Sequence, residues 1–216
     1  MDAYLIPGLG ADHRLFGKLE LPGHTVHHLD WPVMPEGSSL ADFARALAPQ
    51  VDASKPHALV GVSMGGMVAQ ELAALTGPER VVIISSWKGP EEMPAAIKML
   101  RGTHPERVLT AAFMRRTIPF VRWQMGVERP EDVALFDALL GVHSIDQLKV
   151  QIAACLDWKG PAAPVAGLVH IHGDKDHLMP ISYVKGAKVV PDGGHFMVFT
   201  KAKEVQSRVL AALGHG

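Results

Sequence analysis

The sequence predicts an α/β protein of three layers, in which a mainly parallel sheet of about six strands lies between helices. Two observations lead to this prediction. Short apolar runs alternate along the chain with segments whose apolar residues recur at helical spacing. Several of these runs are apolar on both faces, as strands buried within a parallel sheet are. Regular alternation of strand and helix is typical of such a sheet with helices on both sides.

The strands and helices follow one another in a simple order. The predicted strands are residues 3–6, 25–31, 57–62, 81–86, 167–173 and 187–190. The predicted helices between and after them are residues 38–51, 64–75 and 202–213. No strand is expected from 88 to 159, where the helical stretches are residues 95–100, 105–116, 130–140 and 145–158. We therefore expect a folded helical insertion between the fourth and fifth strands.

Length and composition limit the classes of protein. At 216 residues the chain can bury one sizeable core, so we predict a single domain over residues 1–216. A net charge of −1, with both signs interspersed, favours neither nucleic acid nor an anionic membrane as partner. No apolar run approaches the ~20 residues of a membrane span, and the first ten residues lack the basic region of a signal peptide. The composition makes no prediction of oligomeric state.

Cysteine usage indicates the cellular setting. Cys155 is the only cysteine, so no intrachain disulfide can form, and we expect a reducing, cytoplasmic environment. Because Cys155 lies in a segment of helical spacing, it is expected to fill space rather than to react.

The segments that follow the predicted strands carry the chemistry. In open parallel sheets, ligands bind beyond the carboxyl ends of the strands. After the first strand comes PGLGADHRLF, after the third Ser63, after the fourth SSWKG, after the fifth DKDH and after the last PDGGHF. The predicted topology thus brings a serine, two aspartates and a histidine to one edge of the sheet.

Ser63 lies in Gly-Val-Ser-Met-Gly, residues 61–65, between a predicted strand and a predicted helix. A serine at such a junction is held in a strained turn that exposes its hydroxyl. Gly61 and Gly65 lack the side chains that would collide where strand and helix approach, and the helix N-terminus offers free N–H groups. The alternatives are a glycine-rich turn with an incidental serine and a phosphate-binding loop, which would need a lysine after Gly66.

This motif in its strand–helix context resembles the nucleophile elbow of the α/β-hydrolase fold superfamily, and the order serine, aspartate, histidine resembles that family too. The resemblance implies that Ser63 is a nucleophile and that His195, after the last strand, is its base. It places the acid in a loop like Asp176-His177-Leu178-Met179-Pro180, which makes Asp176 the predicted acid. Asp174 is the alternative, expected instead to hold the turn by side-chain to backbone bonding.

The resemblance also implies two backbone N–H donors for a developing oxyanion. These are Met64, after the nucleophile, and Leu9, in the glycine loop of residues 7–10, where Pro7 replaces the usual histidine of the family. No cofactor or metal is expected. A metal site built from His170, His172, Asp174, Asp176 and His177 is the alternative reading, but strand alternation is expected to aim the first two away from the loop.

The chain departs from the fuller family pattern at two points. It starts at the strand that leads into the glycine loop, so we expect this fold to lack the two antiparallel strands common in larger members. Only about 14 residues separate Met179 from Gly194, so the helix before the last strand is expected to be short or absent. Both departures predict a minimal, six-stranded α/β-hydrolase fold.

The fold supports many reactions, so the substrate has to be predicted from the site. We expect a serine hydrolase, carboxylesterase-like or thioesterase-like, that cleaves a small to medium, mainly apolar ester through an acyl-enzyme. The alternatives are a ligand-binding or receptor-like homologue with little turnover, and a C–C bond hydrolase. Residues 88–159 are predicted to cap the site, with Trp87, Phe120 and Trp123 contacting substrate beside a helix break at Pro119.

Overall fold

The computed structural model of the protein describes residues 1–214. Its centre is a sheet of six strands in the order β2-β1-β3-β4-β5-β6, and each neighbouring pair is parallel. The strands are β1 (Asp2–Ile6), β2 (Thr25–His28), β3 (His57–Val62), β4 (Arg80–Ile84), β5 (Leu168–Gly173) and β6 (Lys188–Val190). The prediction of a mainly parallel sheet of about six strands is confirmed.

The central strands are buried on both faces, which is why their sequences do not alternate. Every residue of β3 is buried, and in β4 only the first residue, Arg80, is exposed. The edge strand β2 has no buried residue, and it ends at His28, three residues before the predicted end at Trp31. Beyond His28 the chain makes one further bond to the sheet, from Leu29 N to Leu5 O, before it turns away.

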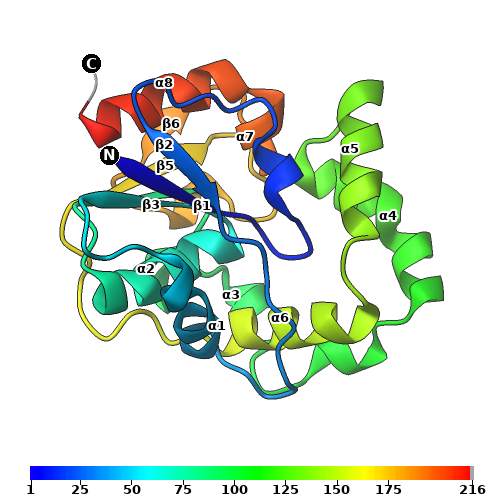
Figure 1. Ribbon diagram of the computed structural model, residues 1–216. Helices are drawn as coiled ribbons and strands as arrows, with labels where there is room; N and C mark the ends of the chain where they lie inside the picture. The colour runs from blue at the N-terminus through cyan, green and yellow to red at the C-terminus, as the bar shows by residue number, and fades with distance from the viewer. Residues whose placement is uncertain (215–216) are drawn as a thin grey trace.

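Helices cover both faces of the sheet (Figure 1). On one face, α1 and α2 form a core with β1 and β3, and on the other face α7 and α8 pack with the opposite sides of the strands. The helices of these layers are α1 (Leu40–Leu47), α2 (Met64–Thr76), α7 (Met197–Thr200) and α8 (Ala202–Leu213), with the short η1 (His13–Phe16) and η2 (Ala48–Gln50). Ser39 starts α1 with a capping box, in which its side chain and that of Asp42 satisfy each other's backbone N–H groups.

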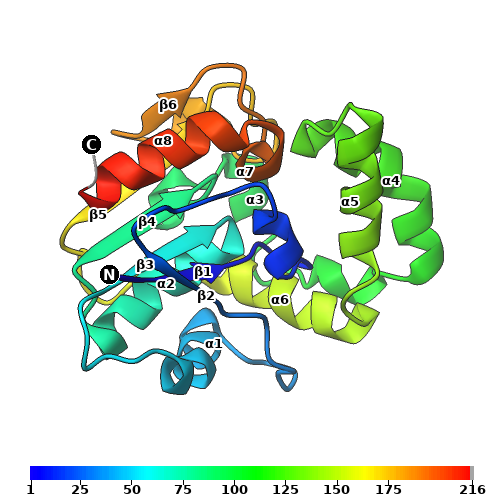
Figure 2. The ribbon, with the colours of Figure 1, turned by 45° about the horizontal axis from the view of Figure 1, so that its top comes forward.

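All the regular secondary structure in the insertion between β4 and β5 is helical, as predicted. Its elements are η3 (Pro90–Glu92), α3 (Ala95–Lys98), η4 (Pro105–Val108), α4 (Ala111–Met125), α5 (Pro130–Leu140) and α6 (Ile145–Asp157). Figure 2 shows these helices beyond the carboxyl ends of the strands, at the opposite end of the sheet from the N-terminus. The insertion therefore lies at the edge where ligands bind in parallel sheets.

Two local predictions have different outcomes. The predicted break at Pro119 is wrong, because α4 continues through Pro119 to Met125. A proline frees the carbonyl four residues earlier, and here both Pro119 and Arg115 are exposed, so water can satisfy that group. The short connection before the last strand is as expected: between β5 and β6 the chain forms only the 3-10 turn η5 (Ile181–Tyr183).

No helix within residues 1–214 is both long and apolar enough to cross a membrane.

Candidate active site

Ser63 occupies the turn between β3 and α2 in a strained backbone conformation. Its φ is 54° and its ψ is −120°, a region that residues with a side chain rarely adopt. Two hydrogen bonds hold it there. Ser63 N–H donates to Ile84 O on β4 at 2.9 Å, and Ser86 Oγ donates to Ser63 O at 2.7 Å. Ser63 borders a cavity that is also lined by residues of the insertion.

Glycines flank Ser63 because strand, turn and helix approach very closely. A Cβ at Gly61 would lie 2.1 Å from Gly65 O, and a Cβ at Gly65 would lie 2.3 Å from the carbonyl oxygens of Ile6 and Pro7. These contacts are with backbone atoms, which cannot move aside as a flexible side chain would. Close packing therefore requires glycine at both positions, as the sequence predicted.

We predict that Gly65→Ala destabilises the protein by about 3 kcal/mol, because the added methyl group would push α2 away from the end of β1. Gly141→Ala is the matched control, since a Cβ there would meet nothing closer than Ala138 O at 3.9 Å. Its free energy of unfolding should stay within about 0.5 kcal/mol of wild type. Guanidinium denaturation measures both, and equal unfolding midpoints for the two variants would contradict the prediction.

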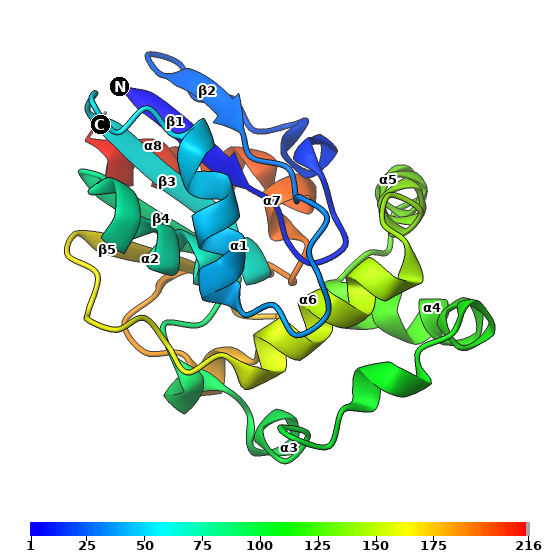
Figure 3. The same ribbon diagram turned by 60° about the horizontal axis from the view of Figure 1, so that its bottom comes forward.

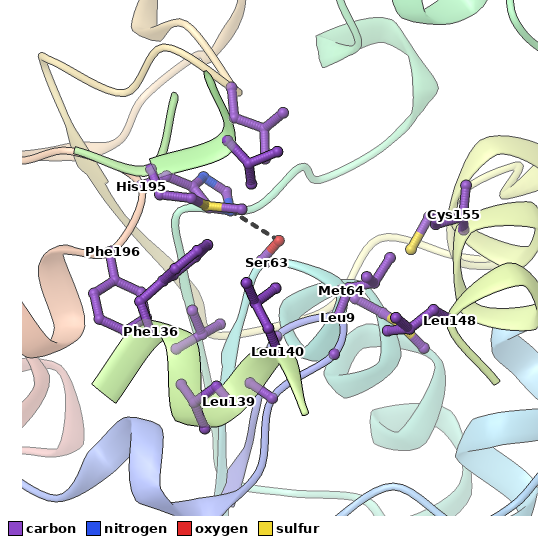
Figure 4. A pocket seen from close by; sticks show the side chains of 18 of the residues that line it. Leu9, Ser63, Met64, Phe136, Leu139, Leu140, Leu148, Cys155, His195 and Phe196 are labelled. Atoms are coloured by element: carbon purple, nitrogen blue, oxygen red, sulfur yellow. Dashed lines mark hydrogen bonds between the residues drawn. The ribbon is translucent and has the colours of Figure 1, made fainter. Parts of the chain in front are cut away.

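The three side chains predicted as catalytic lie in one hydrogen-bonded row. His195 Nε2 is 3.0 Å from Ser63 Oγ, and His195 Nδ1 is 2.8 Å from Asp176 Oδ2. All three side chains are buried, with exposed fractions of 9% for Ser63, 4% for His195 and 3% for Asp176. Figure 4 shows the hydroxyl of Ser63 pointing at the His195 ring. Residues more than a hundred positions apart in sequence are thus brought together at the sheet edge.

Asp176 is held as a carboxylate by its surroundings. Its Oδ1 accepts hydrogen bonds from Leu178 N at 3.0 Å and Met179 N at 2.7 Å. Burial by itself would raise the pKa of this carboxyl, but the charge of His195 and the hydrogen bonds from His195 and Met179 outweigh burial and hold the pKa below its ordinary value. An ionised Asp176 accepts the Nδ1–H of His195, which leaves Nε2 free to accept a proton from Ser63.

The alternative acid lies elsewhere. Asp174 is exposed, and its backbone N–H bonds to Val190 O. The bonding of a side chain to the turn backbone, which we expected of Asp174, is made instead by Asp176.

Leu9 and Met64 both border the cavity onto which Ser63 opens. Gly8, just before Leu9, lies against the nucleophile turn, since a Cβ there would be 3.5 Å from Ser63 Cβ. Within residues 1–214, neither Leu9 N–H nor Met64 N–H donates to another protein group. Met64 is also the first residue of α2, where the helix dipole favours negative charge. Leu9 and Met64 therefore border the same cavity as Ser63, each with a backbone N–H that has no protein partner among the described residues.

The cavity beside Ser63 has a volume of about 420 Å³ and is almost entirely apolar. Its wall combines residues of the sheet edge with residues of the insertion, and none of the described lining residues is Asp, Glu, Lys or Arg. Helix α4 contributes more residues to the wall than any other helix of the insertion, namely Phe113, Met114, Thr117, Ile118, Val121 and Met125. Phe136, Leu139 and Leu140 of α5 and Leu148 and Cys155 of α6 also line the cavity (Figure 4).

Of the three residues predicted to contact substrate, one borders this cavity. Trp87 lines it, with an exposed fraction of 4%. Phe120 and Trp123 do not line it: they are 57% and 54% exposed, and Trp123 stacks on His177 with ring centroids 4.6 Å apart. The prediction for these two residues is corrected. It relied on a helix break at Pro119, whereas in the continuous α4 both side chains are more than half exposed and neither forms part of the cavity wall.

His170 and His172 lie under the Asp176 loop, where we expected them to point away from it. His172 Nε2 donates to Met179 O at 2.7 Å and is 3.5 Å from Asp176 Oδ2, because the chain after β5 folds back over this face. Burial lowers the pKa of His170 to about 3, and it lowers the pKa of His172 as well. Both are therefore neutral at pH 7. Among residues 1–214, no three His, Cys, Asp or Glu side chains are grouped so as to hold a metal ion.

Cys155 lines the same cavity, so it does more than fill space within a helix layer. Burial raises the pKa of its thiol to about 12, so the thiol is protonated at neutral pH and is a weak nucleophile.

Two supporting residues were missed from sequence. Ser86 holds the carbonyl of Ser63, and Gln70 donates from Nε2 to Gly66 O at 3.1 Å and Trp87 O at 2.8 Å. Ser86 lies in the SSWKG segment that follows β4, so its position at the sheet edge was the available signal. Gln70 had no such signal, because a glutamine within a helix pattern is most often exposed.

The protein has a sheet between two layers of helices and a serine in a strained strand–helix turn. The serine is hydrogen-bonded to a histidine, and the histidine to an aspartate. This is the architecture of the α/β hydrolases. The family model described as the alpha/beta hydrolase family matches residues 3–207, and the chain belongs to this family of hydrolases. This confirms the resemblance inferred from the motif.

Solved structures share the fold at low sequence identity. A thermophilic esterase from Thermogutta terrifontis has a TM-score of 0.76 at 17% identity, over 99% of this chain and 89% of that one. A hydrolase from Pseudomonas aeruginosa has a TM-score of 0.73 at 20% identity, with the same shares of 99% and 89%. A type II thioesterase of the yersiniabactin NRPS/PKS biosynthetic pathway has a TM-score of 0.66 at 17% identity, over 99% and 93%. The comparison with curated proteins gives no match.

Proposed function

We propose that the protein is a serine hydrolase that cleaves an uncharged, mainly apolar ester or thioester of small to medium size. The observation that carries the proposal is the row Ser63–His195–Asp176, whose serine end opens onto an apolar cavity of about 420 Å³. A serine hydroxyl becomes a useful nucleophile only beside such a base, itself oriented by an acid. The esterase and thioesterase among structures of the same fold are consistent with either bond.

In the acylation half of this mechanism, Ser63 Oγ attacks the acyl carbonyl carbon while its proton passes to His195 Nε2. Asp176 stabilises the imidazolium that forms. The carbonyl oxygen becomes an oxyanion and accepts hydrogen bonds from Leu9 N–H and Met64 N–H, worth roughly 3 kcal/mol each by analogy with other oxyanion donors. The bond to the leaving oxygen or sulfur then breaks, and His195 returns the proton to that atom.

Deacylation repeats these steps with water. His195 Nε2 takes a proton from a water molecule as the water oxygen attacks the acyl-enzyme carbonyl. The second tetrahedral intermediate collapses, the Ser63 oxygen leaves and regains its proton from His195, and the carboxylic acid departs.

The cavity determines the substrate class. Its described wall lacks charged side chains, so a charged acyl group would lose its hydration without gaining a partner. A saturated or aromatic acyl group instead gains about 0.8 kcal/mol for each buried CH₂. We therefore assign the acyl group, rather than a polar leaving group, to the space under α4.

We predict that wild type hydrolyses p-nitrophenyl esters, and matched thioesters, with a preference for medium over two-carbon acyl chains. Ile118→Trp should fill the cavity under α4 and lower kcat/KM for the longer chains at least tenfold relative to acetate, because each displaced methylene weakens transition-state binding. Trp123→Ala, on the exposed side of the same helix, is the matched control and should keep the wild-type chain-length profile.

Three results would count against this assignment. An unchanged profile in Ile118→Trp would place the acyl group elsewhere. Turnover that survives in Ser63→Ala would exclude the serine mechanism. Saturable binding of these esters without any turnover would favour the ligand-binding alternative.

A further inference from the structure

The loop from Gly8 to Ala11, which carries Leu9, is tied down by side chains at successive backbone groups. Trp31 Nε1 donates to Gly8 O at 2.9 Å, and Gly10 N–H donates to Gln151 Oε1 at 2.8 Å. His143 Nε2 lies 3.3 Å from Ala11 O. Leu9 N–H, between these anchors, donates to no group of residues 1–214. The loop is thus fixed on either side of an N–H that is left free.

Helix α6 presents a row of side chains to the core loops. Gln147 and Gln151 are four residues apart and so share one face of the helix. His143 lies four residues before Gln147, in the segment just before α6 begins. Gln147 accepts from Met34 N at 2.8 Å and donates to Met34 O at 2.9 Å, while Gln151 reaches Gly10. Figure 3 shows α6 alongside the segments that follow β1 and β2. His143 and Gln151 both reach the loop that carries Leu9 N–H, and of the two only Gln151 binds the residue next to Leu9.

Peptide planarity connects these anchors to Leu9. The Gly8 carbonyl and the Leu9 N–H belong to one planar peptide group and point in opposite directions, so the bond from Trp31 fixes where the Leu9 N–H points. Gln151 fixes the next peptide group through the N–H of Gly10. A turn bond from Ala11 N–H to Gly8 O at 3.2 Å restrains the same peptide group, and the two side-chain anchors add to it. Their contribution matters because Gly8 and Gly10 restrict the backbone little, and Gly10 has a φ of +71°.

Both side chains are suited to this task by burial. Gln151 is fully buried and Trp31 is 7% exposed, so neither bond competes with bulk water. Leu148, one turn before Gln151, packs against Gly10 as well, since a Cβ on Gly10 would lie 3.0 Å from Leu148 Cδ2. The insertion therefore contacts the loop by packing and by one hydrogen bond.

We infer that Gln151 and Trp31 are positioning residues that aim the Leu9 N–H at the developing oxyanion, an inference that depends on the proposed hydrolase function. Oxyanion stabilisation requires a donor held in place before the reaction, at 2.7–3.1 Å from the oxyanion. Gln151 belongs to the insertion and Trp31 to the sheet domain, so the donor is correctly aimed only when α6 is seated on the sheet edge.

The test is kinetic. Gln151→Met keeps the shape of the side chain and removes the acceptor, and it should lower kcat for a medium-chain ester roughly 10- to 100-fold with KM within about threefold, because the lost interaction exists mainly in the transition state. Trp31→Phe should act in the same direction. Gln147→Met is the matched control on the same helix face and should keep kcat within about twofold.

Two further measurements separate positioning from general damage. Affinity for a trifluoromethyl ketone, whose adduct with serine carries an oxyanion, should fall in parallel with kcat in Gln151→Met and not in Gln147→Met. Hydrogen exchange of the Gly10 amide should be faster in Gln151→Met alone. Full kcat in Gln151→Met, or equal losses in the two methionine variants, would overturn the inference while the wild-type activity still supports the hydrolase. A wild type without Ser63-dependent turnover would overturn both.

Discussion

Ser63→Ala should lose ester turnover by roughly 10⁵- to 10⁶-fold, and His195→Ala by a similar factor. The expectation rests on the 3.0 Å contact between Ser63 Oγ and His195 Nε2, which makes nucleophile and base a single unit. Without the hydroxyl there is no acyl-enzyme, and without the imidazole the hydroxyl keeps its proton. The double variant should therefore be little worse than either single variant.

A fluorophosphonate probe measures the nucleophile independently of substrate. It should label wild type on one serine and leave Ser63→Ala unlabelled, with His195→Ala labelled far more slowly. Ser207→Ala, on the exposed side of α8, is the control and should react like wild type. Labelling of Ser63→Ala at any other serine, or a double variant much less active than both single variants, would contradict the assignment.

Asp176→Asn should lower kcat by roughly 10⁴-fold, by comparison with the same change in a serine protease, while the protein stays folded. The amide group of an asparagine would donate toward His195 Nδ1 and stabilise the wrong tautomer, with the proton on Nε2. That tautomer cannot accept the proton of Ser63. Because the pKa of Asp176 lies below its ordinary value, wild type should keep this carboxylate as pH falls toward about 4.

Asp174→Asn is the matched control two residues away. Asp174 is exposed and lies outside the hydrogen-bonded row, so kcat should stay within about twofold of wild type. Steady-state kinetics with one ester, together with thermal unfolding of both variants, makes the comparison. If Asp174→Asn loses more activity than Asp176→Asn, the carboxylate that serves His195 has been wrongly chosen.

Much of the fold was predictable because local sequence carries the relevant signal. The buried strands β3 and β4 are continuous apolar runs, and α2 begins where helix formers replace β-branched residues. Parallel strands place their carboxyl ends at one edge, so the segments with Ser63, Asp176 and His195 were expected to meet there. The strand–helix junction also predicted that Gly61 and Gly65 are required for close packing.

The insertion was predictable only as a set of helices. Pattern indicated where α5 and α6 form, but it predicted a helix over 105–116 where α4 spans Ala111–Met125. It did not indicate which face of α4 borders the cavity, because both faces carry large apolar side chains. The prediction that Phe120 and Trp123 contact substrate was wrong because it relied on the local rule that a proline ends a helix. The rule failed because Pro119 and Arg115 face solvent, where water replaces the lost hydrogen bond.

By itself the sequence determined the layers, the strand order along the chain and the residues at the sheet edge, because these depend on periodicity and on strand direction. Only the tertiary structure decided which groups outside the hydrogen-bonded row share a hydrogen bond, such as His172 with Met179 O and Gln151 with Gly10 N–H. Such pairings join residues as far apart as 141 positions, and no local pattern encodes the relative placement of two packed elements. That placement is set by close packing of side chains over the whole core, which a single chain segment cannot reveal.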